Sequence, residues 1–351
     1  MKGTDLLDNA AIAELLAREA EQANGHVRQA FRRAARKALL WEQETYDLLA
    51  AGKPLTELEG IGPFLADRIR EWVEKTPPRI SPPEIREEFL TLTRARRVLA
   101  EHPEVVRARN GDLHTHTCWS DCTGTPAEMA TAAKDRGYQY LAITDHTKAL
   151  KIARGLSEER LFDQGKEIHA INAVLAEKRI DLLILRSAEV NLSPLGQADL
   201  APAALLSLDL VIGSFHSALR RTGDQTERYL AALRNQTIHI LGHPQGRIFN
   251  HREGLKADWP KVFAEAARLD KAFEIDGYPD RQDLKLTLLR SALKEGTRIS
   301  LGTDAHHPWQ LAFMEFALAA AVLAGFKPPQ IVNFLSVDEL RKWVSQISQP
   351  H

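Results

Sequence analysis

The chain has 351 residues, with 46 Lys and Arg against 47 Asp and Glu, a formal net charge of -1 and 44% hydrophobic residues. This length leaves room for about two domains, and the balanced composition excludes collagen-like and disordered proteins. The longest apolar run, at 317–324, is shorter than the roughly 18–20 residues that a membrane helix needs. The acidic, amphipathic start lacks the basic and apolar parts of a secretory signal, so we expect a cytoplasmic protein without membrane contact.

The N-terminal part of the chain predicts a small all-helical domain. Apolar residues recur every three or four positions at 6–22 and again at 27–43, which is typical of amphipathic helices. The Pro-rich segment 76–83 then breaks the pattern. We assign 1–76 to the helical domain and 77–109 to a linker.

Two features of this domain predict contact with DNA. Amphipathic helices are expected on either side of Gly60 and Gly62, where the glycines allow a tight turn and the next helix can present N–H groups to a phosphate. The segment resembles the helix-hairpin-helix motif, which binds the DNA backbone without reading sequence. Arg28, Arg32 and Arg36 share one helix face, which suits phosphate contacts. The alternative for these arginines is an ordinary solvated face.

From about residue 110 onward, short apolar runs alternate with longer amphipathic segments. The runs lie at 140–144, 181–190, 208–215, 237–242, 271–276 and 298–303. Helix-like patterns such as 126–137 and 259–270 lie between them. This β-then-α rhythm predicts an α/β domain over 110–345 whose parallel sheet is closed, or nearly closed, into a barrel.

Metal-ligand residue types gather at the ends of these runs, where β/α barrels carry their catalytic groups. They are His114, His116, Asp121, His146, Glu189, His216, His243, Asp304 and His306. Imidazoles and carboxylates packed together need a cation to offset their desolvation. Nine ligands are too many for one tetrahedral ion, so we expect two or three divalent metals with Glu189 as a bridge. Mixed nitrogen and oxygen donors suit zinc, manganese and iron.

These motifs resemble the polymerase and histidinol phosphatase (PHP) family of metal-dependent phosphoesterases. The resemblance covers about residues 110–345 and rests on DLHTHTCWSD, TDH, SAEVN, GSFHS, GHP and TDAH in the family's order. It implies a distorted (β/α)7 barrel with three metals, manganese or zinc. By analogy, the first metal would take His114, His116, Glu189 and Asp304, the second Glu189, His216 and His243, and the third Asp121, His146 and His306.

The expected mechanism needs no side-chain nucleophile. Water bound to the metals would supply hydroxide near neutral pH, and paired ions would stabilise the attacking and leaving oxygens. Arg247 and Arg281 lie close to strand ends and are predicted to bind phosphate through paired N–H donors. Surface ion pairs are the alternative for both.

Some details look closest to bacterial family X DNA polymerases, although the polymerase palm is missing, since only about thirty residues separate Pro77 from Asn110. We therefore predict a hydrolase of DNA phosphodiester bonds, a 3′–5′ exonuclease or 3′-end trimming enzyme in DNA repair. The first alternative is a small-molecule phosphomonoesterase of the histidinol-phosphatase kind, and the second is a non-catalytic DNA-binding protein. DNA is the expected partner, and no residue indicates a protein partner.

Overall fold

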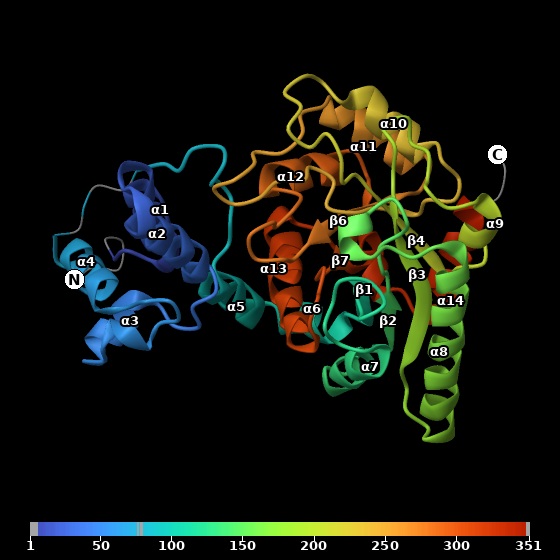
Figure 1. The fold of residues 1–351 in the computed structure, drawn as a ribbon, viewed down its shortest axis with the longest axis horizontal. Coiled ribbons are helices and arrows are strands. Elements are labelled where there is room, and N and C mark those ends of the chain that lie inside the picture. Colours follow the sequence, from blue (N-terminus) through green and yellow to red (C-terminus); the bar gives the residue numbers. More distant parts are fainter. Residues whose placement is uncertain (1–5, 76, 78–79, 349–351) are drawn as a thin grey trace.

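The chain forms a helical domain and a barrel that lie side by side (Figure 1). This computed structural model describes residues 6–75, 77 and 80–348. Residues 1–5 and 76 of the expected helical domain lie outside these ranges. Within the described ranges, no helix has the length and apolarity that crossing a bilayer requires.

The helical domain is built around one apolar cluster. Its elements are α1 (Asn9–Gln22), α2 (Gly25–Ala38), α3 (Thr45–Ala50), the 3-10 turn η1 (Leu55–Glu57) and α4 (Pro63–Lys75). Asp8 caps α1 by accepting a hydrogen bond from the Ala11 N–H. Ile12, Phe31 and Ile69 are buried in the shared core, so the predicted amphipathic helices pack against one another as their apolar spacing indicates.

The turn at Gly60 and Gly62 differs in part from the expected pair of helices. Helix α4 follows the turn as predicted, but only η1 precedes it. Pro54 lies just before η1, and Gly60 takes a left-handed φ of +82° just after it. These two residues leave too short a span for a longer helix.

The segment expected as a linker contains two helices, α5 (Leu92–Glu101) and α6 (Pro103–Ala108). The buried side chains Leu92, Ala95 and Leu99 of α5 belong to the apolar core of the barrel. This part of the chain is therefore packed onto the barrel and is not a free tether.

The barrel has seven parallel strands, which confirms the predicted fold class. They are β1 (Gly111–Thr115), β2 (Tyr140–Ile143), β3 (Leu183–Asn191), β4 (Leu210–Ser214), β5 (Ile240–Leu241), β6 (Ala272–Asp276) and β7 (Arg298–Gly302), hydrogen-bonded in that order. The helices are α7 (Pro126–Asp135), α8 (Glu158–Glu177), α9 (Pro202–Leu205), α10 (Thr226–Leu233), α11 (Trp259–Arg268), α12 (Leu286–Lys294), α13 (Met314–Ala324) and α14 (Val337–Ile347). Short 3-10 turns are η2 (Lys151–Ala153), η3 (Pro308–Phe313), η4 (Pro328–Gln330) and η5 (Val332–Phe334).

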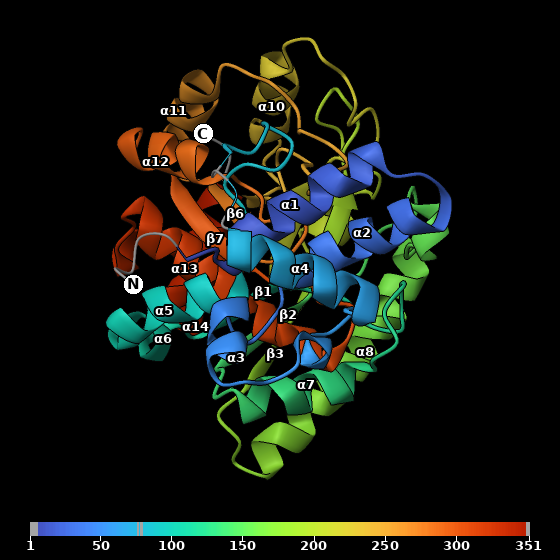
Figure 2. The ribbon, with the colours of Figure 1, turned by 90° about the vertical axis from the view of Figure 1, so that its left-hand side faces the viewer.

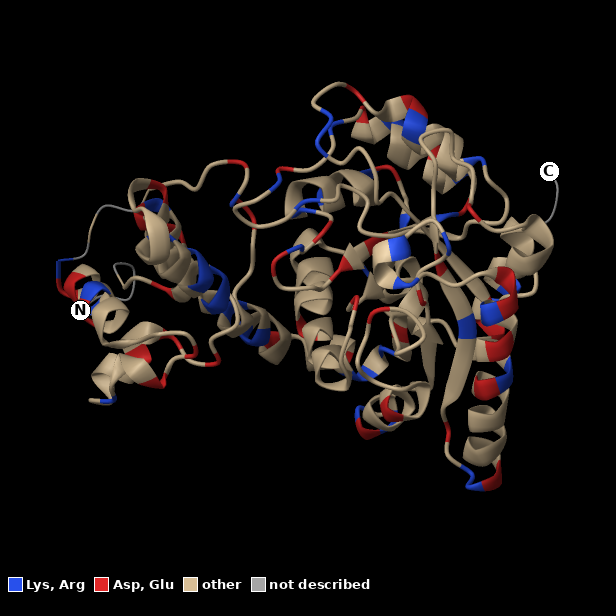
Figure 3. Cartoon of the chain, in the orientation of Figure 1, with Lys and Arg blue, Asp and Glu red and all other residues tan. Residues whose placement is uncertain are grey.

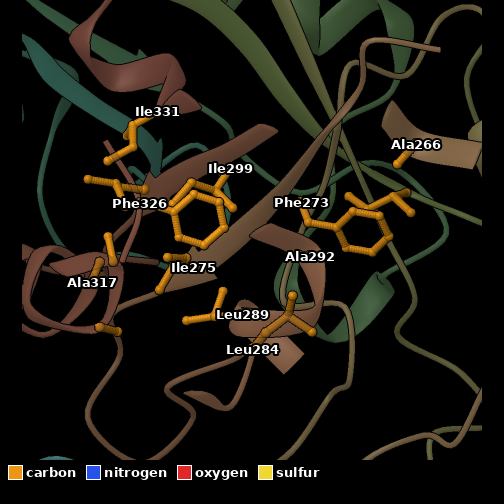
Figure 4. Close-up of a cluster of buried hydrophobic side chains, with 14 of the residues drawn as sticks. Ala266, Phe273, Ile275, Leu284, Leu289, Ala292, Ile299, Ala317, Phe326 and Ile331 are labelled. Carbon is orange, nitrogen blue, oxygen red and sulfur yellow. The ribbon is translucent and has the colours of Figure 1, made fainter. Parts of the chain in front are cut away.

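Side chains alternate between the two faces of each strand, and this separates the outer apolar core from the interior of the barrel. Phe273 and Ile275 of β6 point outward and pack with Ile299 of β7, Leu289 of α12 and Ala317 of α13 (Figure 4). Because successive strand residues face opposite sides, the residue between Phe273 and Ile275 points into the barrel. That residue is a carboxylate, Glu274.

The seam between β1 and β7 is closed by a side chain and by the residues that follow β7. The buried Asn333 amide donates to the carbonyl oxygens of Gly111, at 3.0 Å, and Leu301, at 2.8 Å. Its oxygen accepts from the Leu301 N–H at 2.6 Å. Nearer the carboxyl ends of the strands, the His116 N–H donates to the Ala305 oxygen at 2.9 Å.

The helical domain docks onto loops at the carboxyl ends of the strands. In the loop after β5, Phe249 packs edge-to-face on Phe89, with ring centroids 5.1 Å apart. Arg86 is buried between the two parts, 2.8 Å from Glu14 of α1 and 2.8 Å from the side-chain oxygen of Asn250. Figure 2 shows α1, α2 and α4 in front of the barrel. The domain therefore lies at the end of the barrel where the predicted ligands are.

Candidate metal centre

The strand ends place all nine predicted ligands around one centre. His114 lies in β1 and Glu189 in β3, and the other seven lie in the loops that follow β1, β2, β4, β5 and β7. Parallel strands end at one rim of a barrel, and this brings residues that are far apart in sequence together. The centre is buried, since His114 and Glu189 are fully inaccessible to solvent.

Glu189 lies between five of the histidines. Its Oε1 is 2.6 Å from His243 Nε2 and 3.2 Å from His216 Nε2. Its Oε2 is 2.7 Å from His146 Nδ1, 3.6 Å from His114 Nε2 and 3.7 Å from His116 Nε2. Each carboxylate oxygen thus faces at least two imidazoles, which is the arrangement that a bridging carboxylate needs.

Asp304 and Asp121 complete the centre on its other sides. Asp304 Oδ1 is 2.9 Å from His116 Nε2. Asp121 is 3.5 Å from His146 Nε2 and 3.4 Å from His306 Nε2. His306 Nδ1 lies 2.7 Å from the Asp304 backbone oxygen, and donation there fixes the ring with Nε2 facing Asp121.

Three overlapping groups of side chains could each hold an ion, with ligand atoms within 4.8 Å of one another. They are His116, Asp121, His146 and His306; His114, His116 and Glu189; and His146, Glu189 and His216. Because the groups share members, these residues form one continuous cluster of potential metal ligands.

The donor atoms fit divalent metals. His114 Nε2, His116 Nδ1, His146 Nδ1 and Glu189 Oε2 are buried and make no hydrogen bond with the described residues. His146 Nδ1 and Glu189 Oε2 are 2.7 Å apart, but their contact does not have hydrogen-bond geometry. A buried polar atom without a partner costs about 1–3 kcal/mol, and a cation would satisfy several of these atoms at once. Burial opposes the charge of Glu189, but the neighbouring imidazoles, His146 foremost, hold its pKa well below the ordinary value. Glu189 therefore offers an ionised carboxylate.

Glu274 supports the centre and was not among the predicted residues. Its Oε1 lies 2.6 Å from His114 Nδ1, and its Oε2 accepts from the His243 backbone N–H at 2.6 Å. A side chain in place of Gly302 would collide with Glu274 and with the β-carbon of His114. The signal was present in the sequence, because the run at 271–276 ends in acidic residues and was the one run to which no ligand was assigned.

Asp145, also absent from the predicted set, holds the loop that carries Asp121. It accepts hydrogen bonds from the Thr117 N–H at 2.8 Å and from the Gln164 side chain at 2.6 Å. It also contacts the Ser120 hydroxyl. These bonds fix the loop after β1 against the end of β2.

The structure separates the two arginines that were predicted to bind phosphate. Arg281 lies at the centre, where its guanidinium contacts Asp304 and is 3.8 Å from Asp276. Arg247 is 2% exposed, lies over the Phe89 ring and donates to the Glu87 backbone oxygen. Only Arg281 is therefore brought to the ligands, whereas Arg247 holds the linker.

The residues predicted to contact DNA lie on two elements of the helical domain. Gly60 and Gly62 form the exposed turn before α4. Arg28, Arg32 and Arg36 lie on α2, along which Lys and Arg gather in Figure 3. Arg28 donates to the Ala23 oxygen at 2.7 Å and is thus engaged locally.

Comparisons with known proteins agree with this geometry. Residues 112–279 match the PHP domain. DNA polymerase/3′-5′ exonuclease PolX of Bacillus subtilis is 35% identical over 237 residues, which are 67% of this chain but only 41% of that protein. A probable phosphatase of Thermoanaerobacter sp. is 28% identical over 247 residues, which are 67% of this chain and 94% of that protein.

Among solved structures, the histidinol phosphate phosphatase of Lactococcus lactis, in complex with zinc, L-histidinol and phosphate, is similar at 19% identity. The match has a TM-score of 0.46 and covers 62% of this chain and 95% of that chain.

Proposed function

Residues 112–279 belong to the PHP domain family, and from this membership and the metal cluster we infer that the chain is a metal-dependent hydrolase of phosphoester bonds. We propose further that its substrate is DNA, which it trims from the 3′ end in repair. The first proposal is carried by the ligand set, and the second by the position of the helical domain.

The nine ligands would hold three divalent ions, manganese or zinc. Glu189 would bridge, with His114, His116 and Asp304 on one side and His216 and His243 on the other, while Asp121, His146 and His306 would hold the third ion. When bound, such ions supply Lewis acidity that activates water and offsets charge at phosphorus. The histidines are held in place by their neighbours, as in the pairs of His114 with Glu274 and of His216 Nδ1 with Asn191 at 3.0 Å.

Arg281 is the residue of the centre best suited to orient the phosphate. Its side chain is about one-third exposed, unlike that of the buried ligand Asp304 beside it, and a guanidinium presents N–H donors in a planar fork. Asp304 and Asp276 lie beside it and fix its position. The free N–H groups can therefore bind a phosphate oxygen without a change of rotamer.

DNA is favoured because the helical domain docks at the barrel end that carries the ligands. Arg86 and Phe89 join this domain to the loop after β5, the strand that leads to His243. A module with an exposed glycine turn and an arginine-bearing helix beside a phosphoesterase centre suits a substrate with many phosphates. The 35% identity with a protein named as a polymerase and 3′-5′ exonuclease supports the same substrate.

A small-molecule phosphomonoesterase is the second candidate. Relatives named as probable phosphatases align over most of their length, 94% for the Thermoanaerobacter protein. In that case, the helical domain would serve only as a cover or an oligomer contact, and substitutions that remove its positive charges would not alter turnover.

The deciding experiment compares 5′-labelled single-stranded DNA with a small phosphomonoester in the presence of Mn²⁺. We expect a ladder of DNA shortened from its 3′ end. His114→Ala should abolish it, whereas His102→Ala, at an exposed histidine outside the centre, should not. Phosphate release from the monoester with intact DNA would support the second candidate, and inertness toward both substrates would refute the hydrolase.

A further inference from the structure

Exposed arginines without ion-pair partners lie on α2. Arg32 and Arg36 are exposed, and neither has a hydrogen bond or ion pair with any residue in the described part of the chain. Some arginines on the other helices of the domain are paired, such as Arg18 with Glu14 at 2.7 Å and Arg68 with Glu71 at 2.7 Å. The charge of α2 is therefore left available for a ligand.

Two barrel loops that follow metal ligands carry positive charge as well. In the loop after His216, Arg220 donates to His251 Nε2 at 2.8 Å, since a guanidinium can only donate. In the loop after His243, Arg252 donates to the Gly246 oxygen. The acidic residue beside it, Glu253, lies 3.9 Å from Lys256 and so has a cation of its own.

Helix α2 lies in front of the barrel in Figure 2, and its charges act on the loop that carries His251. Burial lowers the pKa of His251, and so do the positive charges around it, which come from Arg220, Arg252, Arg36 and Arg32. Burial and the charge of Arg281 likewise lower the pKa of Arg252. Because Arg281 contacts Asp304, positive charge continues from the helical domain to the metal centre.

We call these four residues the arginine track. They are Arg32, Arg36, Arg220 and Arg252. Asp283 offsets part of the charge of Arg252, but like charges brought together still repel one another, and a polyanion would relieve this repulsion. Among the ligands at the end of the track, His114 and His116 are fully inaccessible, whereas Asp121 and His306 are partly exposed. A free 3′ end can reach the inner ligands more readily than a phosphodiester inside an intact duplex. Enzymes whose active-site pocket cannot reach its target atom inside a duplex act on single-stranded DNA or on an extruded nucleotide.

We propose that the arginine track binds the phosphates of one single strand of DNA and leads its 3′ end to the metal centre. The inference rests on the proposed DNA hydrolase function and adds to it the path and the strandedness of the substrate. A cationic groove that follows the backbone is how proteins bind single strands without sequence preference.

The test uses the full-length protein with Mn²⁺, oligothymidylates of increasing length and the 4-nitrophenyl ester of thymidine 5′-monophosphate. In the wild type, kcat/KM should rise with length until the strand spans the track. In Arg32→Glu/Arg36→Glu, the ratio of kcat/KM for long strands to that for the ester should fall about tenfold or more, because two phosphate contacts are lost; tenfold corresponds to about 1.4 kcal/mol. Arg220→Glu should act in the same direction from the barrel side.

The matched control is Arg33→Glu, because Arg33 is exposed on the same helix but lies about 100° around it from Arg32. Binding of phosphorothioate strands gives a second readout. Loss of two contacts should lower the slope of log Kd against log salt by about 1.4, at about 0.7 per phosphate of a single strand.

Three results would contradict the inference or its premise. If the wild type cleaves DNA but the paired variant and Arg33→Glu change the ratio alike, the track is wrong and the hydrolase stands. If duplex binds more tightly than single strands and depends on Arg32 and Arg36, the strandedness is wrong. If the wild type cleaves neither DNA nor the ester, the proposed function itself fails.

Discussion

Glu274→Gln should weaken metal binding by about 10- to 100-fold, although the substitution changes no metal ligand. Glu274 is 1% exposed, and its two oxygens face two donors, His114 Nδ1 and the His243 backbone N–H, each at 2.6 Å. A glutamine has the same size but only one acceptor oxygen, so one buried donor must face an NH₂ group. An unsatisfied buried donor costs about 1–3 kcal/mol, which matches the about 1.4–2.7 kcal/mol of a 10- to 100-fold loss.

The assay is calorimetric titration of metal-stripped protein with Mn²⁺ and Zn²⁺, with circular dichroism to verify the fold. Glu177→Gln, at an exposed position near the end of α8, removes the same charge far from the centre and should bind metal as the wild type does. Equal affinities for both variants would refute the reasoning, because Glu274 would then have no part in orienting His114.

Three further changes test other parts of the structure. Asn333→Ala should lower the free energy of unfolding by about 3 kcal/mol, since three buried backbone groups lose a partner worth about 1 kcal/mol each. Asn110→Ala, which loses two hydrogen bonds at a half-buried position, should lower it less when both variants are unfolded in urea. A larger loss for Asn110→Ala would contradict the role of Asn333 in joining β1 and β7. Burial lowers the pKa of Lys271 from the ordinary 10.5 to about 7. Between these two pH values the unfolded chain holds a proton that the folded chain has released, so the free energy of unfolding of the wild type rises with pH over this range. Lys271→Met should therefore raise Tm most below about pH 7, with a gain that shrinks at alkaline pH; a gain independent of pH would speak against a charged, buried lysine. Gly302→Ala should reduce bound metal in elemental analysis, because its side chain would displace Glu274, and full metal content would show that this space is not needed.

The barrel and its ligands could be predicted because their signals are local. Each strand from β2 to β7 lies in a short apolar run, and a ligand such as His146 or His216 follows directly, so one rule about strand ends brings distant residues together. The first strand, β1, carries its ligands in a polar segment instead. Glu274 was missed because it lies within a strand, where only the alternation of facing sides shows that it points inward.

The arrangement of the two domains could not be predicted from local patterns. The segment that forms helix α5 was predicted as part of a linker. Only its packing in the barrel core shows that its apolar face is buried there. Arg247 follows a ligand closely in sequence, but the turn after His243 sends its side chain toward Phe89. Such choices depend on contacts between residues far apart in the chain, which spacing along the sequence does not encode.

The order of the ligands along the chain has a consequence for biosynthesis. His114 lies in the first strand of the barrel and His116 directly after it, whereas Asp304 and His306 follow the last strand, and Asn333 ties the two strands together later still. A ribosome-bound chain therefore carries its arginine-bearing helices long before it can complete the centre. Under the proposed function, the newly made protein would carry its DNA-contacting helices before it could hydrolyse a phosphodiester.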